Sequence, residues 1–183
     1  MKKIAILLED GFEEIEAIVP IDVLRRLEFD VILAGKTAKV AGAHNIHIDT
    51  DSLIEELKAD ELDAVILPGG LPGSTNLRDN PVVIELISSM YNSGKLVSAI
   101  CAAPIALQKA GIMNGKVCTG YPMPMLKEAL SDAEYTGERV EVDGNIITGK
   151  GPGAAFEFAV AIAAYLGKEP QARSLMKNMF QKI

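Results

Sequence analysis

The chain has 183 residues, of which 49% are hydrophobic and 23% charged, and its formal net charge is −7. This length and composition are typical of one globular domain, residues 1–183, with a sizeable core, and they exclude an intrinsically disordered chain. The acidic balance argues against nucleic acid as a primary partner, because no Lys/Arg cluster offsets the repulsion from a phosphate backbone.

The amino-terminal stretch predicts neither export nor membrane insertion. The basic start Met1-Lys2-Lys3 is followed by an apolar run, Ile4 to Leu8, that is too short for a signal peptide and is interrupted by Glu9-Asp10. No run approaches the length of a membrane span, so we expect no membrane partner. We therefore expect a cytoplasmic protein in which Cys101 and Cys118 are free thiols.

The predicted strands are short apolar runs that end in Gly, Pro or charged residues, at 3–8, 30–34, 64–67, 96–100, 117–119, 139–142 and 146–148. Helical periodicity is expected at about 12–27, 53–58, 81–93, 104–111, 154–166 and 170–180, with a further helix after 121–124. We expect Ser52 to cap the second helix and Phe180 to pack in the last. Such alternation predicts an α/β fold with a mostly parallel sheet covered by helices on both faces.

One carboxylate falls on the apolar face of the first predicted helix. Steps of three and four residues place Glu16 on the stripe of Phe12 and Val23, whereas Glu13 and Glu14 lie off it. A buried carboxylate takes up a proton or finds hydrogen-bond partners. Glu16 is therefore a candidate acid–base residue, although a position at the edge of the stripe that reaches water would also explain it.

Residues 35–48 predict a polar hairpin that carries both histidines of the chain. His44 and His47 are three residues apart, with Asp49 and Asp51 nearby. Such a group could bind a metal, but a solvated polar edge is the more common explanation, and we expect no metal.

The segment around Cys101 predicts a strand that turns sharply into a helix. Residues 96–100 are mostly apolar, and Pro104 is tolerated only in the first turn of a helix. Such an elbow lifts a side chain out of the sheet, and the N–H groups of a helix start favour a thiolate. The alternative is a small buried core residue, which is our expectation for Cys118.

Ligands of parallel α/β folds bind at the carboxyl ends of the strands. Gly11, the pair Gly69-Gly70, Cys101 and Tyr121 all follow predicted strands closely, and adjacent glycines let backbone N–H groups approach a ligand. We therefore expect them to converge. Residues 144–150 match the start of a phosphate loop, but the match is rejected because 146–148 reads as strand and Gly follows the Lys.

Four motifs in register resemble the ThiJ/PfpI superfamily, in the branch of the Parkinson-disease protein deglycase and bacterial YajL. They are Glu9–Glu16, Leu67–Gly70, Ala99–Pro104 and Gly151–Gly153, and the resemblance covers essentially the whole chain. The resemblance implies a flavodoxin-like three-layer sandwich with a nucleophile elbow, usually as a homodimer.

By motif, Cys101 matches the family nucleophile and Glu16 the acid that hydrogen-bonds its sulfur. Gly70, in the Gly69-Gly70 pair, and Ala102 match the positions whose backbone N–H groups form the oxyanion site. The chain departs from many members in the loop after the short strand, where Tyr121 stands near the position of a histidine. The dimer implied by the resemblance would place His44 near the partner's cleft, where it could act in trans.

These features favour a cysteine-dependent enzyme that acts on small reactive carbonyls such as methylglyoxal, or on their adducts with proteins. Cys101 would form a hemithioacetal, Glu16 would move protons, and no cofactor would be needed. A different class of function uses the same residues: an oxidative-stress sensor or redox-controlled chaperone that works through oxidation of Cys101. A cysteine peptidase is less well supported, because Tyr121 is a poor general base at neutral pH. A thiamine-pathway role is a weaker alternative, since it rests only on the family label ThiJ.

Overall fold

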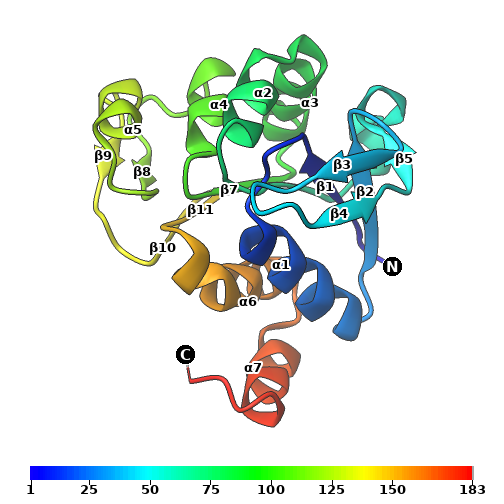
Figure 1. Cartoon of the computed structure of the whole chain (residues 1–183). Coiled ribbons are helices and arrows are strands. Elements are labelled where there is room, and N and C mark those ends of the chain that lie inside the picture. Colours follow the sequence, from blue (N-terminus) through cyan, green and yellow to red (C-terminus); the bar gives the residue numbers. More distant parts are fainter. Residues whose placement is uncertain (183) are drawn as a thin grey trace.

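A seven-stranded sheet lies at the centre of the computed structural model, which describes residues 1–182 (Figure 1). In sheet order the strands are β10 (Val140–Asp143), β11 (Ile146–Gly149), β7 (Leu96–Ile100), β6 (Ala64–Leu67), β1 (Lys3–Leu8), β2 (Asp30–Gly35) and β5 (Ser52–Leu53). Neighbouring strands are parallel except for the β10–β11 hairpin. The predicted α/β fold is confirmed.

Helices cover both faces of the sheet, and the two cores follow the alternation of the strand residues. Ile4 and Ile6 of β1 pack in one cluster, with α1 (Glu14–Arg26), α6 (Ala155–Tyr165) and α7 (Glu169–Asn178). Ala5 and Leu7 pack in the other, with α2 (Gly73–Asp79), α3 (Pro81–Asn92) and α4 (Pro104–Lys109). Figure 1 shows these groups below and above the sheet. Because successive strand residues point to opposite faces, each face has its own apolar layer.

Several smaller elements lie outside the central sheet and its covering helices. The hairpin of β3 (Lys39–Ala41) and β4 (His47–Asp49) confirms the polar hairpin. The remaining elements are β8 (Val117–Cys118), β9 (Glu134–Tyr135), α5 (Pro124–Ala129) and three 3₁₀ turns, η1 (Ile54–Glu56), η2 (Ala59–Glu61) and η3 (Pro152–Ala154). The β8–β9 pair forms a sheet of its own.

The structure differs from the sequence-based expectation at four places. Ser52 lies in β5 instead of capping a helix, and only a 3₁₀ turn follows it. The segment after Gly69-Gly70 contains α2, which was not predicted. Glu14 is 5% exposed because the β3–β4 hairpin covers it, and Phe180 is 94% exposed because it lies beyond the end of α7.

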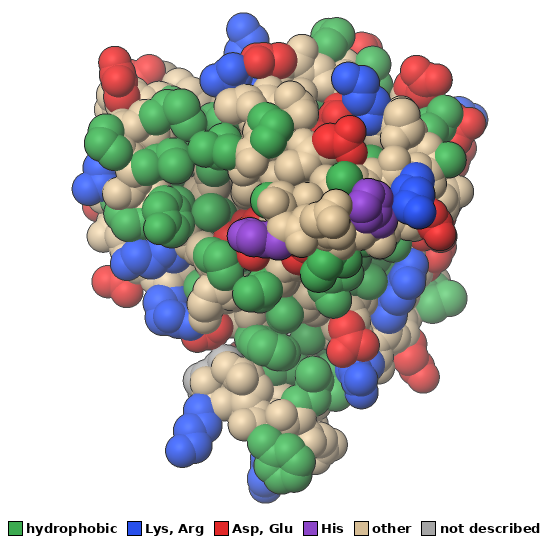
Figure 2. Space-filling model, viewed as in Figure 1, with side chains coloured by type: hydrophobic (Ala, Val, Ile, Leu, Met, Phe, Trp, Pro, Cys, Tyr) green, Lys and Arg blue, Asp and Glu red, His purple; other side chains and the backbone are tan. Residues whose placement is uncertain are grey.

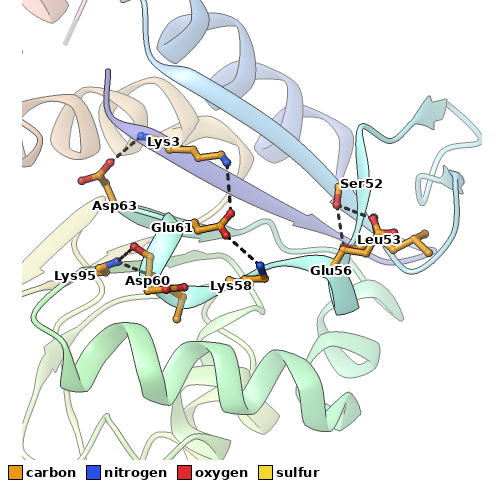
Figure 3. Close-up of polar contacts among 10 residues, drawn as sticks. Lys3, Ser52, Leu53, Glu56, Lys58, Asp60, Glu61, Asp63 and Lys95 are labelled. Atoms are coloured by element: carbon orange, nitrogen blue, oxygen red, sulfur yellow. Dashed lines mark hydrogen bonds and ion pairs between the residues drawn. The ribbon is translucent and has the colours of Figure 1, made fainter.

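The amino ends of the central strands are held by polar contacts (Figure 3). Asp63, just before β6, accepts hydrogen bonds from the backbone N–H of Lys3 and from Lys2 Nζ, both at 2.8 Å. Lys95, just before β7, donates to the carbonyls of Ala59 and Asp60 at 2.6 and 2.9 Å. Each of these polar groups has a partner. Among residues 1–182, no helix is both long and apolar enough to cross a membrane.

Candidate active site

The expected convergence at the carboxyl ends of the strands is present. The Gly70 backbone approaches so closely that a Cβ there would lie 2.4 Å from both the Gly11 carbonyl oxygen and the Glu13 nitrogen. The Tyr121 N–H donates to the Cys101 carbonyl at 2.9 Å. Loops that follow β1, β6 and β8 therefore all meet at the turn after β7.

Cys101 occupies the elbow between β7 and α4. Its backbone is in the left-handed region, with φ +65°, which for a residue other than glycine costs about 1–3 kcal/mol. The Cys101 N–H donates to the Gly149 carbonyl at 2.8 Å, and the Ala103 N–H donates to the Ile100 carbonyl at 3.1 Å. These bonds hold the strained residue in place, and its side chain lies at the surface of the core, with the residue 9% exposed.

Glu16 points inward from α1 and is fully buried, as the helical wheel predicted. Glu16 Oε2 accepts a hydrogen bond from the Gly69 N–H at 2.8 Å, while Oε1 has no partner among the described residues. Burial raises the pKa of the Glu16 carboxyl to about 7, and the negative charge of Glu13 adds to this effect, whereas the contacts with Cys101 and Gly69 oppose it. Near neutral pH this carboxyl can therefore both give and take a proton.

The thiol of Cys101 interacts with this carboxyl. Burial raises the thiol pKa, and the charge and hydrogen bonding of Glu16 raise it further, whereas the N–H groups of Gly70 and Ala102 lower it. The N–H group of Ala102 at the helix start therefore favours the thiolate, as predicted, but burial next to a carboxylate outweighs the effect of this six-residue helix. The two groups titrate as a pair. When Glu16 holds a proton its charge is gone, and only burial still opposes the thiolate.

Only glycine fits between these two side chains. A Cβ at Gly69 would lie 2.3 Å from Glu16 Oε2 and 2.5 Å from the Cys101 Cβ. The missing side chain lets the backbone N–H of Gly69 reach the buried carboxyl. The backbone at Gly69 therefore lies close to other groups, as predicted for the Gly69-Gly70 pair, and the groups that it approaches are Glu16 and Cys101.

A hollow of about 270 Å³ adjoins this pair. It is lined by Tyr121, Pro122, Arg139, Lys150 and the residues 151–154. A Cβ at Gly151 would lie 3.4 Å from the Tyr121 ring and 3.9 Å from Glu16 Oε1. Arg139 and Lys150 were not predicted as lining residues, although the position of the glycine-rich segment 151–153 directly after β11 was a usable signal.

His44 contacts Glu14 and not Cys101. Its backbone N–H donates to Glu14 Oε1 at 2.6 Å, and Nδ1 lies 2.8 Å from Glu14 Oε2, with the His44 side chain 73% exposed. Burial raises the pKa of Glu14, but the hydrogen bonds from His44 outweigh it, so the net pKa is lowered. Within residues 1–182, Glu13, Glu14 and His44 form the one group close enough to hold a metal. Two of its members already bond each other, and His47 does not belong to it.

Two further sequence interpretations can be compared with the fold. Cys118 is fully buried in β8, and burial raises its pKa to about 11, so it is a core thiol as expected. Residues 146–149 form β11, which rules out the loop that a phosphate-binding motif would require.

The DJ-1/PfpI family model matches residues 2–165. The chain is 36% identical to protein dj-1beta of Drosophila melanogaster over 181 residues, covering 97% of this chain and 96% of that protein. It is 39% identical to the Parkinson disease protein 7 homolog of Danio rerio over 169 residues, with 90% and 89% covered. It is 37% identical to the glutathione-independent glyoxalase DJR-1.2 of Caenorhabditis elegans over 170 residues, with 91% and 89% covered.

Solved structures agree with these relatives. The crystal structure of Drosophila DJ-1beta is 36% identical and superimposes with a TM-score of 0.93, covering 100% of this chain and 99% of that one. A mutant DJ-1 superfamily protein from Salmonella typhimurium gives 36% identity and a TM-score of 0.91, with both chains fully covered. The sandwich is therefore the flavodoxin-like α/β fold of these proteins, and the chain belongs to the DJ-1/PfpI family.

Proposed function

We propose that this protein is a cysteine-dependent enzyme that converts small α-oxoaldehydes such as methylglyoxal into hydroxy acids. One observation carries the proposal: a fully buried carboxyl with a pKa of about 7 contacts a cysteine held on a strained elbow. The relative from Caenorhabditis elegans that is named a glutathione-independent glyoxalase supports the same chemistry. Deglycation of early protein adducts would use the same two residues.

In the first step the Cys101 thiolate adds to the aldehyde carbon, and the former carbonyl oxygen takes a proton to give a hemithioacetal. Glu16 then removes the hydrogen on that carbon as a proton and returns a proton to the adjacent ketone carbon, while the hydroxyl proton of the hemithioacetal passes to the former ketone oxygen. The aldehyde carbon is thereby oxidised to a thioester while its neighbour is reduced to an alcohol. Water attacks the thioester, the sulfur leaves, and lactate is released. The reaction requires no external oxidant.

The surroundings of Cys101 suit these steps. The N–H groups of Gly70 and Ala102 hydrogen-bond the sulfur and lie within reach of an oxygen on the carbon attached to it. Tyr121, which is 46% exposed, forms a wall of the adjacent hollow. Glu16, the carboxyl that contacts the sulfur, is assigned both proton transfers.

The proposal includes a cytoplasmic homodimer. Large apolar side chains are exposed on α1 and in the hairpin loop, with Ile15 51%, Ile18 43% and Ile46 53% exposed, and together they form a surface suited to a second copy. In such a dimer His44 could reach the partner's cleft. If so, Ile46→Asp should give monomers in light scattering, and His44→Gln should slow turnover only in the dimer.

Conversion of methylglyoxal to lactate by the purified protein tests the proposed enzymatic activity. Cys101→Ser should abolish lactate formation with an unchanged melting temperature, whereas Cys118→Ser, which changes the buried core thiol, should keep the activity. Glu16→Gln should slow lactate formation and shift the pH dependence of Cys101 alkylation. Normal turnover in Cys101→Ser would exclude the mechanism.

A redox sensor or redox-controlled chaperone is the second candidate function. A protonated Glu16 beside the sulfur could hydrogen-bond an oxidised cysteine, and the DJ-1 of Toxoplasma gondii, 29% identical with a TM-score of 0.91, is described as oxidized. If purified protein produces no lactate but dilute peroxide converts Cys101 to the sulfinic acid, as read by intact mass, the sensor function is favoured.

A further inference from the structure

The hollow next to Cys101 has a cationic wall in an otherwise acidic protein. Arg139 and Lys150 line it, although the chain as a whole carries a formal charge of −7. Figure 2 shows hydrophobic side chains gathered on the left of this face, over α5 and β8, with Lys and Arg side chains along the lower edge of that area. Pro122, Pro152 and Ala154 also line the hollow, so it combines apolar walls with positive charge.

The two cations differ in how far they are neutralised. Arg139 forms an ion pair with Glu157 at 2.6 Å and also donates to the Gly153 carbonyl, so its charge is largely balanced. Lys150 Nζ donates to the Gly137 carbonyl at 2.6 Å, and no carboxylate of residues 1–182 pairs with it. A lysine ammonium has three donors, so this bond leaves capacity for an anion.

Lys150 is also held in place by its backbone. Its N–H donates to the Arg139 carbonyl at 2.9 Å, directly after the β10–β11 hairpin. With the side chain tied to Gly137 and the main chain tied to Arg139, the ammonium is positioned before any ligand binds. Such preorganisation reduces the entropy lost when an anion is bound.

The hollow and the Cys101–Glu16 pair have two neighbours in common, Gly151 and Tyr121, and the Tyr121 N–H donates to the Cys101 carbonyl at 2.9 Å. This glycine lines the hollow, and a Cβ on it would contact the Tyr121 ring at 3.4 Å and approach Glu16 Oε1 at 3.9 Å. Glu16 Oε1 is buried and has no hydrogen-bond partner among the described residues. A substrate bound to the sulfur could therefore extend past Gly151 toward Lys150.

We propose that Lys150 is a specificity-determining residue that favours carbonyl substrates bearing an anionic group, a phosphate or a carboxylate, over neutral α-oxoaldehydes. The assignment of these compounds as substrates rests on the proposed function. The electrostatic part of the inference does not, because it concerns how any anionic electrophile approaches Cys101.

Alkylation of Cys101 tests the electrostatic part without turnover. Iodoacetate and iodoacetamide have nearly the same shape but differ by one negative charge. In a Cys118→Ser background, Lys150→Gln should lower the iodoacetate-to-iodoacetamide rate ratio about threefold, the range expected of an exposed ion pair, and added salt should diminish the difference. Lys150→Arg should keep the ratio, and Lys177→Gln, a charge removal on α7, should leave it unchanged.

The Gln side chain retains an N–H donor for the Gly137 carbonyl, which separates charge from structure. If Lys150 only anchors that loop, Lys150→Gln should leave the rate ratio unaltered, and the inference is overturned. An equal fall in Lys177→Gln would overturn it as well, because the effect would then reflect only net charge.

Turnover tests the choice of substrate. Hydroxypyruvaldehyde and its phosphate ester form a matched neutral and anionic pair, and Lys150→Gln should raise KM for the phosphate ester while leaving KM for the neutral compound within twofold. A carboxylate-bearing arylglyoxal compared with phenylglyoxal distinguishes carboxylate from phosphate selection. If the rate ratio falls in Lys150→Gln but neither compound is turned over, the anion site stands and the proposed function fails. If both compounds are turned over and the ratio of their KM values is the same in Lys150→Gln and in the unmodified protein, the specificity assignment fails but the proposed function stands.

Discussion

The two ends of the central sheet use polar residues in opposite ways. At the amino ends, Asp63 and Lys95 each satisfy two groups, and their side chains lie at or near the surface. At the carboxyl ends, Glu16 is fully buried with one oxygen unpartnered, and Cys101 has a left-handed backbone. One end is relaxed and hydrogen-bonded, while the other holds strain and an incompletely satisfied acid.

This difference separates groups that stabilise from groups that can react. Exposed ion pairs such as Lys58–Glu61 contribute only about 0–1 kcal/mol to stability. Burial, in contrast, raises the pKa of a carboxyl well above its ordinary value, and such a carboxyl destabilises the fold when it ionises. Retention of such a group at the end that carries Cys101 is the physical argument for function there.

The largest effect is expected from filling the space between Glu16 and Cys101. Gly69→Ala would place a Cβ 2.3 Å from Glu16 Oε2 and 2.5 Å from the Cys101 Cβ, so one of them must move. We expect a loss of about 3 kcal/mol in unfolding free energy and a fall of at least ~10²-fold in turnover. Denaturant melts and lactate assays measure both. Gly153→Ala is the stability control, because nothing lies within 4 Å of its Cβ position; equal stability of the two variants would contradict the packing argument.

The next effect is the pH dependence of stability. The pKa of Glu16 is raised from 4.5 to about 7, so the folded state binds more protons between these pH values and the free energy of unfolding falls as pH rises through them. The loss levels off above pH 7 at about 3 kcal/mol. Urea melts of Glu16→Gln and of the unmodified protein across this range should diverge by that amount.

Glu14 supplies a control of opposite sign for the pH experiment. Hydrogen bonds from His44 leave its pKa below the ordinary value, so its contribution to stability is present above the pKa of the unfolded chain and is lost as pH falls. Glu14→Gln should therefore be less stable than the unmodified protein at neutral pH, with the difference shrinking in acid. If both variants show the same slope, Glu16 is not the group with the raised pKa.

A smaller effect is expected at the amino ends. Asp63→Asn removes the charge that pairs with Lys2 and weakens the hydrogen bond from the Lys3 N–H, and we expect a loss of about 1 kcal/mol. Thermal melts should register this change, while KM and kcat for methylglyoxal remain those of the unmodified protein. A change in turnover would mean that the two ends of the sheet are coupled.

The smallest effect is expected for an isolated surface pair. Lys58→Gln breaks the exposed contact with Glu61, 3.3 Å long in the structure, and should change the unfolding free energy by less than about 0.5 kcal/mol. The same denaturant series used for Asp63→Asn is sufficient to measure it. A loss above 1 kcal/mol would show that the amino-end contacts act as a network.

Much of the sheet and the elbow could be predicted because those features are local. Apolar runs of four to six residues mark the strands, and Pro104 marks the start of α4 three residues after Cys101. The inward position of Glu16 follows from helical periodicity alone. In contrast, the burial of Glu14, which lies off the apolar stripe, could not be predicted, because the β3–β4 hairpin that covers it is far away in the sequence.

By itself the sequence determined the α/β class, the place of Cys101 at a strand end and the face on which Glu16 lies. Tertiary structure alone decided which way the Cys101 pKa moves and that Lys150 lines a hollow beside Tyr121. The reason is that helical and strand periodicity depend on residues that are close together in the sequence. Burial and the distances between charges arise only when separate layers pack, and these set desolvation and Coulomb energies.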